Sequence, residues 1–251
     1  MTGLMILGTA AAVAFEGHDH THLLIESEER TVLVDCAGSP VLKLAKVSRH
    51  VNQITDLIVT HFHPDHVTGI PLLLMNMWLL GRERRLDIYG LEHAVSRLRA
   101  MMGLFDWAEW GGMYPVDFQI LAEEEMTPVL EGKNLRILSS PVDHLLPTIG
   151  LRVEFLKEDF VIAYSSDTAP CPQTVRLADG ADILIHEAAG GYQGHTAPAD
   201  AGAVAEQAGV EKLYLIHYSV HQRSPAEQLA EAQKSFSGQV EMAEDLLEIK
   251  L

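Results

Sequence analysis

The sequence predicts an α+β fold of the αββα type, in which two β-sheets lie face to face between outer layers of helices. Three features of the hydrophobic pattern support this prediction. Strands open the chain, residues 116–164 are rich in strand patterns, and strands alternate with helices near the end. We see no linker in the 251 residues and therefore expect one domain over residues 1–251.

The elements of the first half are apolar runs separated by turn residues. The charged turn Glu28–Arg30 splits one long run into two strands. Ser39 can cap the helix that follows, and Pro40 suits its first position. In chain order we expect strands in LMILGTA (4–10) and HLLIESEERTVLVDC (22–36), a helix in SPVLKLAKVSR (39–49), a strand in ITDLIVTH (54–61), a helix in GIPLLLMNMWLLG (69–81), a strand in RLDIYG (85–90) and a helix in LEHAVSRLRAMMGLF (91–105).

The second half begins with strands and ends with strands and helices in alternation. This order favours the sandwich over a simple doubly wound sheet. We expect strands in VDFQIL (116–121), LRILSS (135–140), IGLRVEF (149–155), DFVIAYS (159–165) and ADILIHEA (181–188), a helix in TAPADAGAVAEQAG (196–209), a strand in KLYLIHYS (212–219), a helix in SPAEQLAEAQKSF (224–236) and the closing segment VEMAEDLLEIKL (240–251).

Composition limits the partners and the compartment. The formal net charge of −17 disfavours long-range attraction to a polyanion, unless bound cations or a local basic patch reverse the field. We interpret the densest basic residues, Arg82, Arg84, Arg85, Arg97 and Arg99, as a solvated helix face.

The cysteines and the apolar N-terminal run bear on localisation. Two cysteines, Cys36 and Cys171, are too few for a disulfide framework and favour a reducing compartment. No Lys or Arg precedes the first apolar run, so we expect no signal peptide, and no run is long enough to cross a bilayer. We therefore expect a cytoplasmic protein without a membrane partner.

A dense group of polar residues follows the buried strand ending in LIVT. The segment THFHPDHVTG (60–69) contains His61, His63, Asp65 and His66. Alternation along an extended segment sends the first three to one side, and a turn at Pro64 can bring His66 to join them. Imidazole nitrogens and carboxylates are ligands of Zn²⁺, Mn²⁺ and Fe²⁺. The segment predicts a metal site at the edge of a sheet.

The HxHxDH pattern resembles the metal motif of the metallo-β-lactamase superfamily, whose fold is an αββα sandwich with a two-metal site between the sheets. Its further motifs have counterparts here in the same order. They are His144 in SSPVDHLLPTIG, Asp167 in VIAYSSDTAP and His217 in LYLIHYS. The resemblance covers nearly the whole chain.

The resemblance implies a binuclear site with seven ligands and room for a bridging hydroxide. It assigns one metal to His61, His63 and His144, the second to Asp65, His66 and His217, and the bridging position to Asp167. We expect two zinc ions, with Mn²⁺ or Fe²⁺ as alternatives. Asp35, at the end of TVLVD, either orients a ligand histidine or is a turn residue.

The segment LIHEAAGGYQGHTAP (184–198) resembles the ribonuclease Z branch of the superfamily, in which HEAT and GHS or GHT motifs recur. By that resemblance Glu187 is the partner of His195, which donates a proton to the departing oxygen after a metal-bound hydroxide attacks phosphorus. The expected catalytic residues are Asp65, Glu187 and His195. The alternative is that residues 194–196 only begin a helix, with Thr196 as its N-cap.

Two departures from ribonuclease Z shape the expected substrate. Ribonuclease Z carries a tRNA-gripping arm between the positions of His144 and Asp167, where this chain has room only for a hairpin. HEAA replaces HEAT, so Ala189 stands in place of Thr. We expect a phosphodiesterase for small or short phosphodiesters, such as cyclic nucleotides or RNA ends, and doubt a large RNA.

The sequence leaves other functions and roles open. The alternatives are a tRNA 3′-end endonuclease, a metal-dependent lactonase, thioesterase or β-lactamase-like hydrolase, an oxygen-reducing diiron protein, and a metal-binding protein without catalysis. His18, His20 and His22 lie in an expected loop, where His22 either contacts substrate or is merely polar. We expect His186 to be structural. Residues 101–114 are core or a lid, and helix 70–80 is core or the face of a homodimer.

Overall fold

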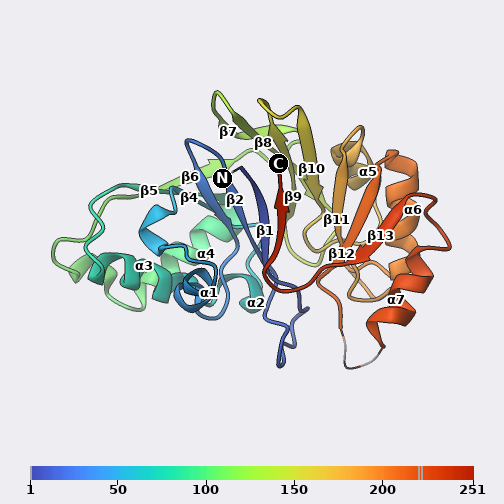
Figure 1. The fold of residues 1–251 in the computed structure, drawn as a ribbon. Coiled ribbons are helices and arrows are strands. Elements are labelled where there is room, and N and C mark those ends of the chain that lie inside the picture. Colours follow the sequence, from blue (N-terminus) through green and yellow to red (C-terminus); the bar gives the residue numbers. More distant parts are fainter. Residues whose placement is uncertain (1, 220, 222) are drawn as a thin grey trace.

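The computed structural model describes residues 2–219, 221 and 223–251 and consists of two seven-stranded sheets packed face to face (Figure 1). The first sheet has the order β14 (Leu247–Lys250), β1 (Gly3–Gly8), β2 (His22–Glu26), β3 (Thr31–Val34), β4 (Asp56–Ile58), β5 (Leu86–Leu91) and β6 (Val116–Leu121). The second has the order β13 (Gln239–Met242), β12 (Lys212–Ile216), β11 (Ile183–Glu187), β10 (Phe160–Tyr164), β9 (Thr148–Phe155), β8 (Leu135–Val142) and β7 (Thr127–Glu131).

Helices cover the outer face of each sheet, which confirms the predicted α+β sandwich (Figure 1). On the side of the first sheet lie α1 (Pro40–Lys46), α2 (Pro64–Val67), α3 (Ile70–Leu79) and α4 (Glu92–Gly103), with the short 3₁₀ turns η1 (Val51–Gln53) and η2 (Trp107–Glu109). On the side of the second lie α5 (Pro172–Ala178), α6 (Pro198–Ala208) and α7 (Pro225–Ala232). In the part of the chain that the structure describes, no helix combines the length and apolarity needed to span a membrane.

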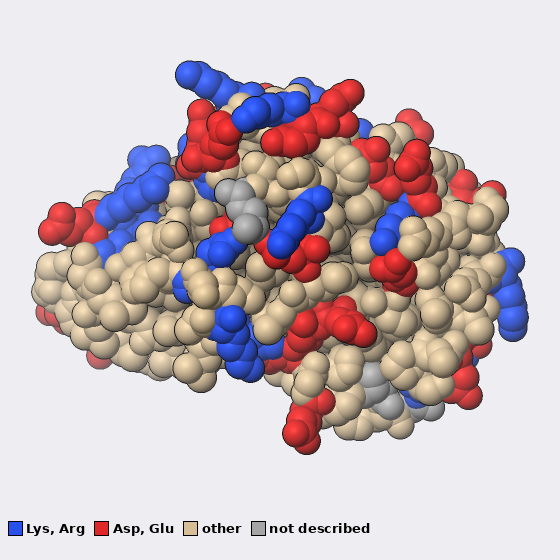
Figure 2. Space-filling model, viewed as in Figure 1, with Lys and Arg blue, Asp and Glu red and all other residues tan. Residues whose placement is uncertain are grey.

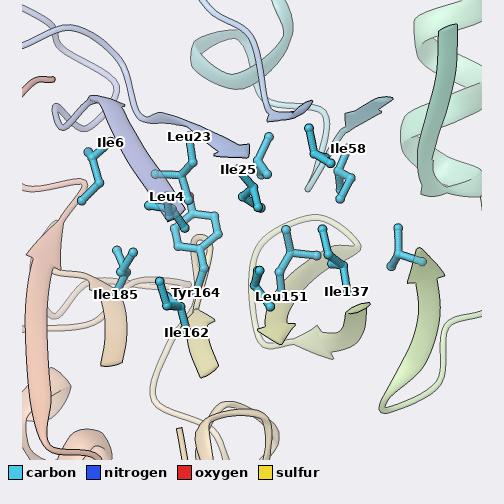
Figure 3. Packing of buried hydrophobic residues seen from close by; sticks show 14 of the residues in the cluster. Leu4, Ile6, Leu23, Ile25, Ile58, Ile137, Leu151, Ile162, Tyr164 and Ile185 are labelled. Carbon is cyan, nitrogen blue, oxygen red and sulfur yellow. The ribbon is translucent and has the colours of Figure 1, made fainter. Parts of the chain in front are cut away.

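Alternation along the strands builds the core between the sheets. Leu4 and Ile6 of β1 face the second sheet, whereas Met5 and Leu7 face the helices of the first sheet. Figure 3 shows Leu4 and Leu23 opposite Tyr164 of β10. Because a fully buried Leu or Ile contributes about 1.5–3 kcal/mol, this layer is a main source of stability.

The strand directions explain why polar residues collect at one edge. In the first sheet β3, β4 and β5 run parallel, and in the second β10, β11 and β12 do so. The carboxyl ends of parallel strands meet at one sheet edge, where ligand sites favour forming. The segments after these strands carry most of the predicted site residues.

Most predicted elements are present, and the differences have physical reasons. Strand β7 was not predicted, because Pro128 and neighbouring acidic residues obscure its pattern, and the short helix α5 was not predicted either. Ser39 takes the N-cap position of α1, but its side chain makes no capping hydrogen bond. The closing segment forms two strands, and β14 returns to the first sheet to pair with β1.

The interpretation of the arginines as one solvated helix face was wrong for Arg82, Arg84 and Arg85, which lie between α3 and β5 and not in a helix. Arg82 is moreover buried. Its side chain is only 4% exposed and lies in the turn between α3 and β5. The guanidinium donates hydrogen bonds to the carbonyl oxygens of Ile54, Arg84 and Arg85. Arg82 therefore ties a turn together, because its five donors satisfy carbonyls that no strand or helix partners.

Candidate active site

The seven predicted metal ligands lie together at the edge where the two sheets meet. Asp167 is central, because its Oδ2 lies 3.2 Å from Nε2 of His217 and 3.5 Å from Nε2 of His66. The same oxygen is 3.8 Å from Nε2 of His61. This position between the others is the one that a bridging carboxylate needs.

The remaining predicted ligands surround Asp167 in two groups. Nδ1 of His63 lies 3.1 Å from Nε2 of His61 and 3.1 Å from Nε2 of His144. Asp65 Oδ2 lies 3.6 Å from Nε2 of His66. Two sets each have donor atoms within 4.8 Å of one another: His61, His63, His144 and Asp167, and Asp65, His66 and His217.

Four of these histidines have their Nδ1 atom occupied, which leaves Nε2 for the cluster. Nδ1 of His61 pairs with Thr60 Oγ1 at 3.0 Å, and Nδ1 of His217 pairs with Thr21 Oγ1 at 3.2 Å. His144 Nδ1 donates to the Gly194 carbonyl at 2.7 Å. Such outer contacts fix the ring orientation of metal-binding histidines.

Asp35 makes the fourth of these contacts. Its Oδ2 lies 2.7 Å from Nδ1 of His66, and its two oxygens also accept from the backbone N–H and hydroxyl of Thr60. Asp35 is fully buried and holds its backbone at φ 59°, in the left-handed region that Asp tolerates. Of the two roles left open by the sequence, the geometry favours orientation of His66.

Unusual backbone angles recur around the cluster. Ser166 has φ 55° and His217 has φ 50°, and both directly follow strands or their short extensions at this edge. Non-glycine residues in this region cost free energy and concentrate at functional sites, because the surrounding structure must hold them there. Here the bend after β12 is what brings the His217 ring back towards Asp167.

The donor set fits divalent metal ions. Among the described residues, Nε2 of His66 and Oδ1 of Asp167 are buried without a hydrogen-bond partner, although both atoms belong to the cluster. Buried polar atoms are rarely left unpaired, so these atoms are suited to a partner other than the protein. Nitrogen and oxygen donors at such spacing match the chemistry of zinc, manganese or iron.

His195 and Glu187 form a pair next to this cluster. Nδ1 of His195 lies 2.9 Å from Oε1 of Glu187, whose other oxygen accepts from the backbone N–H of Ala189 at 2.7 Å. Glu187 ends β11 and is 1% exposed, and the His195 ring stacks 5.9 Å from that of His217. The carboxylate therefore fixes the tautomer and direction of the imidazole.

The surroundings of the pair control its protonation. Burial lowers the pKa of His195, but its hydrogen bond to Glu187 and the charges of Glu187, Asp167 and Asp65 outweigh this effect, so that the pKa is raised. Burial raises the pKa of Glu187 to about 7, against the opposing effect of His195. A ring nitrogen of His195 also lies within 4.8 Å of donor atoms of Asp167 and His217. Because a protonated imidazole does not bind metal, the raised pKa favours the role of proton donor.

Thr196 does not cap α6, so the alternative interpretation of the GHT motif was wrong in this respect. The N-cap is Ala197, and the Thr196 hydroxyl instead donates to the carbonyl of Thr168. The backbone N–H of Thr196 donates to Oε1 of Glu187 at 3.0 Å. Thr196 thus anchors the loop to the site.

Among the described residues, the other histidines that the sequence singled out belong to none of the groups that could hold a metal ion. His22 begins strand β2 rather than lying in a loop, and its buried Nδ1 pairs with the His20 carbonyl. His18 stacks on Phe15. His186 is buried and pairs with the carbonyl of Glu187, as a structural residue would.

Residues 101–114 pack beside α3, where the Trp110 ring stacks 5.4 Å from that of Trp78. Met101, Phe105 and Trp110 line a cavity of about 450 Å³ together with Thr68 of the α2–α3 junction. The segment therefore borders the helix of the metal motif, and its role as a lid stays a prediction.

Sequence reasoning missed the residues that support the site from outside the cluster. Thr21 pairs with His217 and lies in no motif, and the Gly194 carbonyl pairs with His144, a contact that the GHT motif does not reveal. Thr60 could have been found, because it directly precedes the first histidine of the motif. Tyr192 was also missed; its ring lies 4.8 Å from that of His195.

Solved structures share this architecture. The metallo-β-lactamase fold protein YhfI from Bacillus subtilis superimposes with a TM-score of 0.81 at 21% identity, covering 98% of each chain. The short form of human tRNase Z gives 0.80 at 22% identity over 99% of each chain. A diphosphatase of the PhnP family gives 0.78 at 17% identity, covering 99% of this chain and 97% of the other.

Two relatives that resemble the chain in sequence are both named ribonuclease Z. Ribonuclease Z from Methanothermobacter thermautotrophicus is 26% identical over 306 aligned positions, covering 100% of this chain and 97% of the relative. Ribonuclease Z from Ignicoccus hospitalis is 27% identical, with coverage of 98% and 97%. Fold and site thus define a metallo-β-lactamase-fold protein of the ribonuclease Z-like branch. Within it, the chain belongs to the family of the anti-Pycsar protein Apyc1, whose sequence profile matches residues 2–242.

Proposed function

We propose that this protein is a binuclear metal-dependent phosphodiesterase for small or short phosphodiesters, with His195 as the proton donor. The observation that carries the proposal is the buried Glu187–His195 pair beside a cluster of seven nitrogen and oxygen donors. Relatives named ribonuclease Z support a phosphodiester as the substrate. The proposed compartment is the cytoplasm.

The proposed ligand sets are those that the geometry groups together. One ion would be held by His61, His63 and His144, and the other by Asp65, His66 and His217. Asp167, which lies near residues of both sets, would serve both ions. When bound, two divalent cations, proposed as zinc, lower the pKa of water and neutralise charge on the phosphoryl oxygens. Asp65, proposed to act in catalysis as well as in metal binding, is half-buried at the mouth of the cluster.

Glu187 and His195 then act together to protonate the departing oxygen. Glu187 keeps Nδ1 of His195 engaged, so the imidazole presents its other nitrogen. An alkoxide is a poor leaving group and needs a proton as its bond to phosphorus breaks. Proton transfer from a positioned side chain typically contributes 10²–10⁴-fold to the rate.

A small substrate fits the shape and charge of the chain. The segment between His144 and Asp167 forms the hairpin of β9 and β10, which turns at residues 156–159 and carries no arm. On the face shown in Figure 2, acidic and basic side chains alternate without a continuous basic track. With a net charge of −17, the protein offers little long-range attraction to a large RNA.

Substitution of His195 tests the proposed function. In His195→Ala, hydrolysis of a 3′,5′-cyclic nucleotide, which releases an alkoxide, should fall by about 10²–10⁴-fold. Hydrolysis of bis(p-nitrophenyl) phosphate should fall far less, because nitrophenolate leaves without a proton. The measurement is kcat/KM for both esters in the metal-loaded enzyme, with Gln193→Ala, an exposed neighbour, as the matched control. Equal losses on both esters would contradict the role of His195.

The curated relatives favour a second candidate, a tRNA 3′-end endonuclease. The same panel should therefore contain a precursor tRNA and a simple lactone. Cleavage of the precursor at rates above those of the small diesters would favour the endonuclease. Turnover of the lactone alone would overturn the phosphodiesterase proposal.

A further inference from the structure

Two apolar side chains stay exposed beside the proposed proton donor. Tyr192 is 55% exposed and Leu145 is 53% exposed. Leu145 follows His144 directly in the chain, and Tyr192 lies three residues before His195. An exposed leucine alone is ordinary, but an exposed aromatic ring next to a reactive imidazole is a candidate for ligand contact.

The loop geometry holds the Tyr192 ring against His195. The two ring centroids are 4.8 Å apart, with the planes tilted by 53°. The His195 N–H donates to the Tyr192 carbonyl at 2.9 Å, which closes a tight turn. A Cβ added to Gly190 would lie 3.1 Å from Cε1 of Tyr192. The ring therefore lies close to both the Gly190 backbone and the imidazole.

Leu145 reaches the same loop from the second sheet. A Cβ added to Gly194 would lie 3.0 Å from Cγ of Leu145 and 3.1 Å from Nδ1 of His144. The His144 and His195 rings are 4.9 Å apart, edge to face. Tyr192 thus lies against His195, and Leu145 lies against Gly194 next to His144, so both side chains border the two histidines. We call these two side chains the apolar rim.

We propose that the apolar rim binds a flat, unsaturated ring carried by the leaving group of the substrate, and that Tyr192 is a specificity-determining residue. This inference rests on the proposed function, since the leaving oxygen must approach His195 to receive its proton. The group attached to that oxygen then comes to lie over Tyr192 and Leu145. A planar ring can stack on the tyrosine face, whereas a small alkyl alcohol leaves both side chains in water.

Binding of two product analogues to the metal-loaded protein tests the inference without relying on turnover. A nucleoside 5′-monophosphate carries a phosphate, a ribose and a planar base, and ribose 5-phosphate lacks only the base. Titration calorimetry should give a dissociation constant about tenfold lower for the nucleotide, because base stacking on an aromatic ring is typically worth a factor of that order. Tyr192→Leu should abolish this preference, and Tyr192→Phe should keep it.

Leu145→Asn should reduce the preference, and Leu156→Asn serves as its matched control. Leu156 is 46% exposed and follows β9, whereas Leu145 precedes it, so the two leucines lie at opposite ends of this strand. With bis(p-nitrophenyl) phosphate, Tyr192→Leu should raise KM by about tenfold at nearly constant kcat. A merely structural role for Tyr192 would instead lower kcat in both Tyr192 variants.

The outcomes separate this inference from the proposed function. Equal affinities for the two analogues in the wild type, or equal loss in Tyr192→Phe and Tyr192→Leu, would overturn the role of the apolar rim. Absence of diester hydrolysis by the wild-type enzyme would overturn the proposed function and leave the binding result to be judged by itself.

Discussion

At the scale of single residues, the site depends on side chains that hold other side chains. Asp35 is the clearest case, because one buried carboxylate contacts both His66 and Thr60. Thr60 in turn pairs with Nδ1 of His61. One residue of the first sheet therefore sets the direction of two imidazoles, one in each proposed ligand set.

We expect Asp35→Asn to weaken metal binding while leaving the fold in place. Asn tolerates the left-handed backbone that residue 35 adopts, but its neutral amide no longer supports the His66 ring as a carboxylate does. Loss of such a contact typically costs 10–100-fold in metal affinity. Competition with a chelator of known affinity would measure the change.

The matched control for this experiment is Asp56→Asn. Asp56 is also buried in the first sheet, where its carboxylate accepts from Arg30 at the other end of the parallel strands. The Asp56→Asn variant should be less stable in urea unfolding but should keep the metal affinity of the wild type. If both variants lost the same affinity, Asp35 would have no specific link to the metal site.

The residues of the site could be predicted from the sequence where they occur together in short motifs. The HxHxDH segment and three later motifs indicated seven side chains that the structure brings together, although their role as ligands stays a prediction. Thr21, Gly194 and Tyr192 could not be predicted. Thr21 and Gly194 contact histidines far away in the sequence, and the ring contact of Tyr192 with nearby His195 depends on the shape of the loop.

At the scale of elements, hydrophobic periodicity predicted strands well and short helices poorly. The eight-residue strand β9 alternates clearly, whereas α5 has only seven residues and starts at Pro172. In β7, Pro128 suggested a break, but the strand lies at the edge of its sheet, where proline is tolerated. Both α5 and β7 depend on their position in the tertiary structure, which the sequence does not display.

Helices α6 and α7 approach each other so closely at Gly202 that a larger residue there should destabilise the fold. A Cβ on Gly202 would lie 2.4 Å from the carbonyl oxygen of Ala232, so Gly202→Ala must push the two helices apart. We expect a loss of about 1–3 kcal/mol in the free energy of unfolding. Equilibrium urea unfolding of the two proteins would measure it.

Gly103→Ala is the matched control, because Gly103 also lies in a helix but has open space around its Cβ position. Alanine is the better helix former, so this variant should be neutral or gain up to about 1 kcal/mol. Equal destabilisation of both variants would show that the helix contact is not what makes Gly202 necessary.

At the scale of the whole molecule, the cluster joins the two sheets. His61, His63 and His66 follow a strand of the first sheet, and Asp167 and His217 follow strands of the second. Bound metal ions would therefore brace the sandwich as well as serve the reaction. The sandwich could be predicted from the sequence, because the order of the strands and their apolar content determine which layers can pack.

Metal loading should therefore stabilise the entire fold. We expect the zinc-loaded protein to retain two ions per chain after desalting, measured by plasma emission spectroscopy. Free metal at 100 times its dissociation constant should add about 2.7 kcal/mol to the free energy of unfolding, and chelation should remove it. Fewer than two ions in a protein with intact Asp167 and His217, or no change in the thermal midpoint on chelation, would contradict the binuclear proposal.

The pairing of β1 with β14 has a consequence for biosynthesis. Residues 3–6 emerge from the ribosome long before residues 247–250, the strand that pairs with their free edge. Until then the nascent chain carries β1 as an open edge with unpaired backbone groups, a surface on which other chains can assemble. Deletion of residues 247–250 should therefore lower the soluble yield of this protein far more than the loss of four residues would suggest.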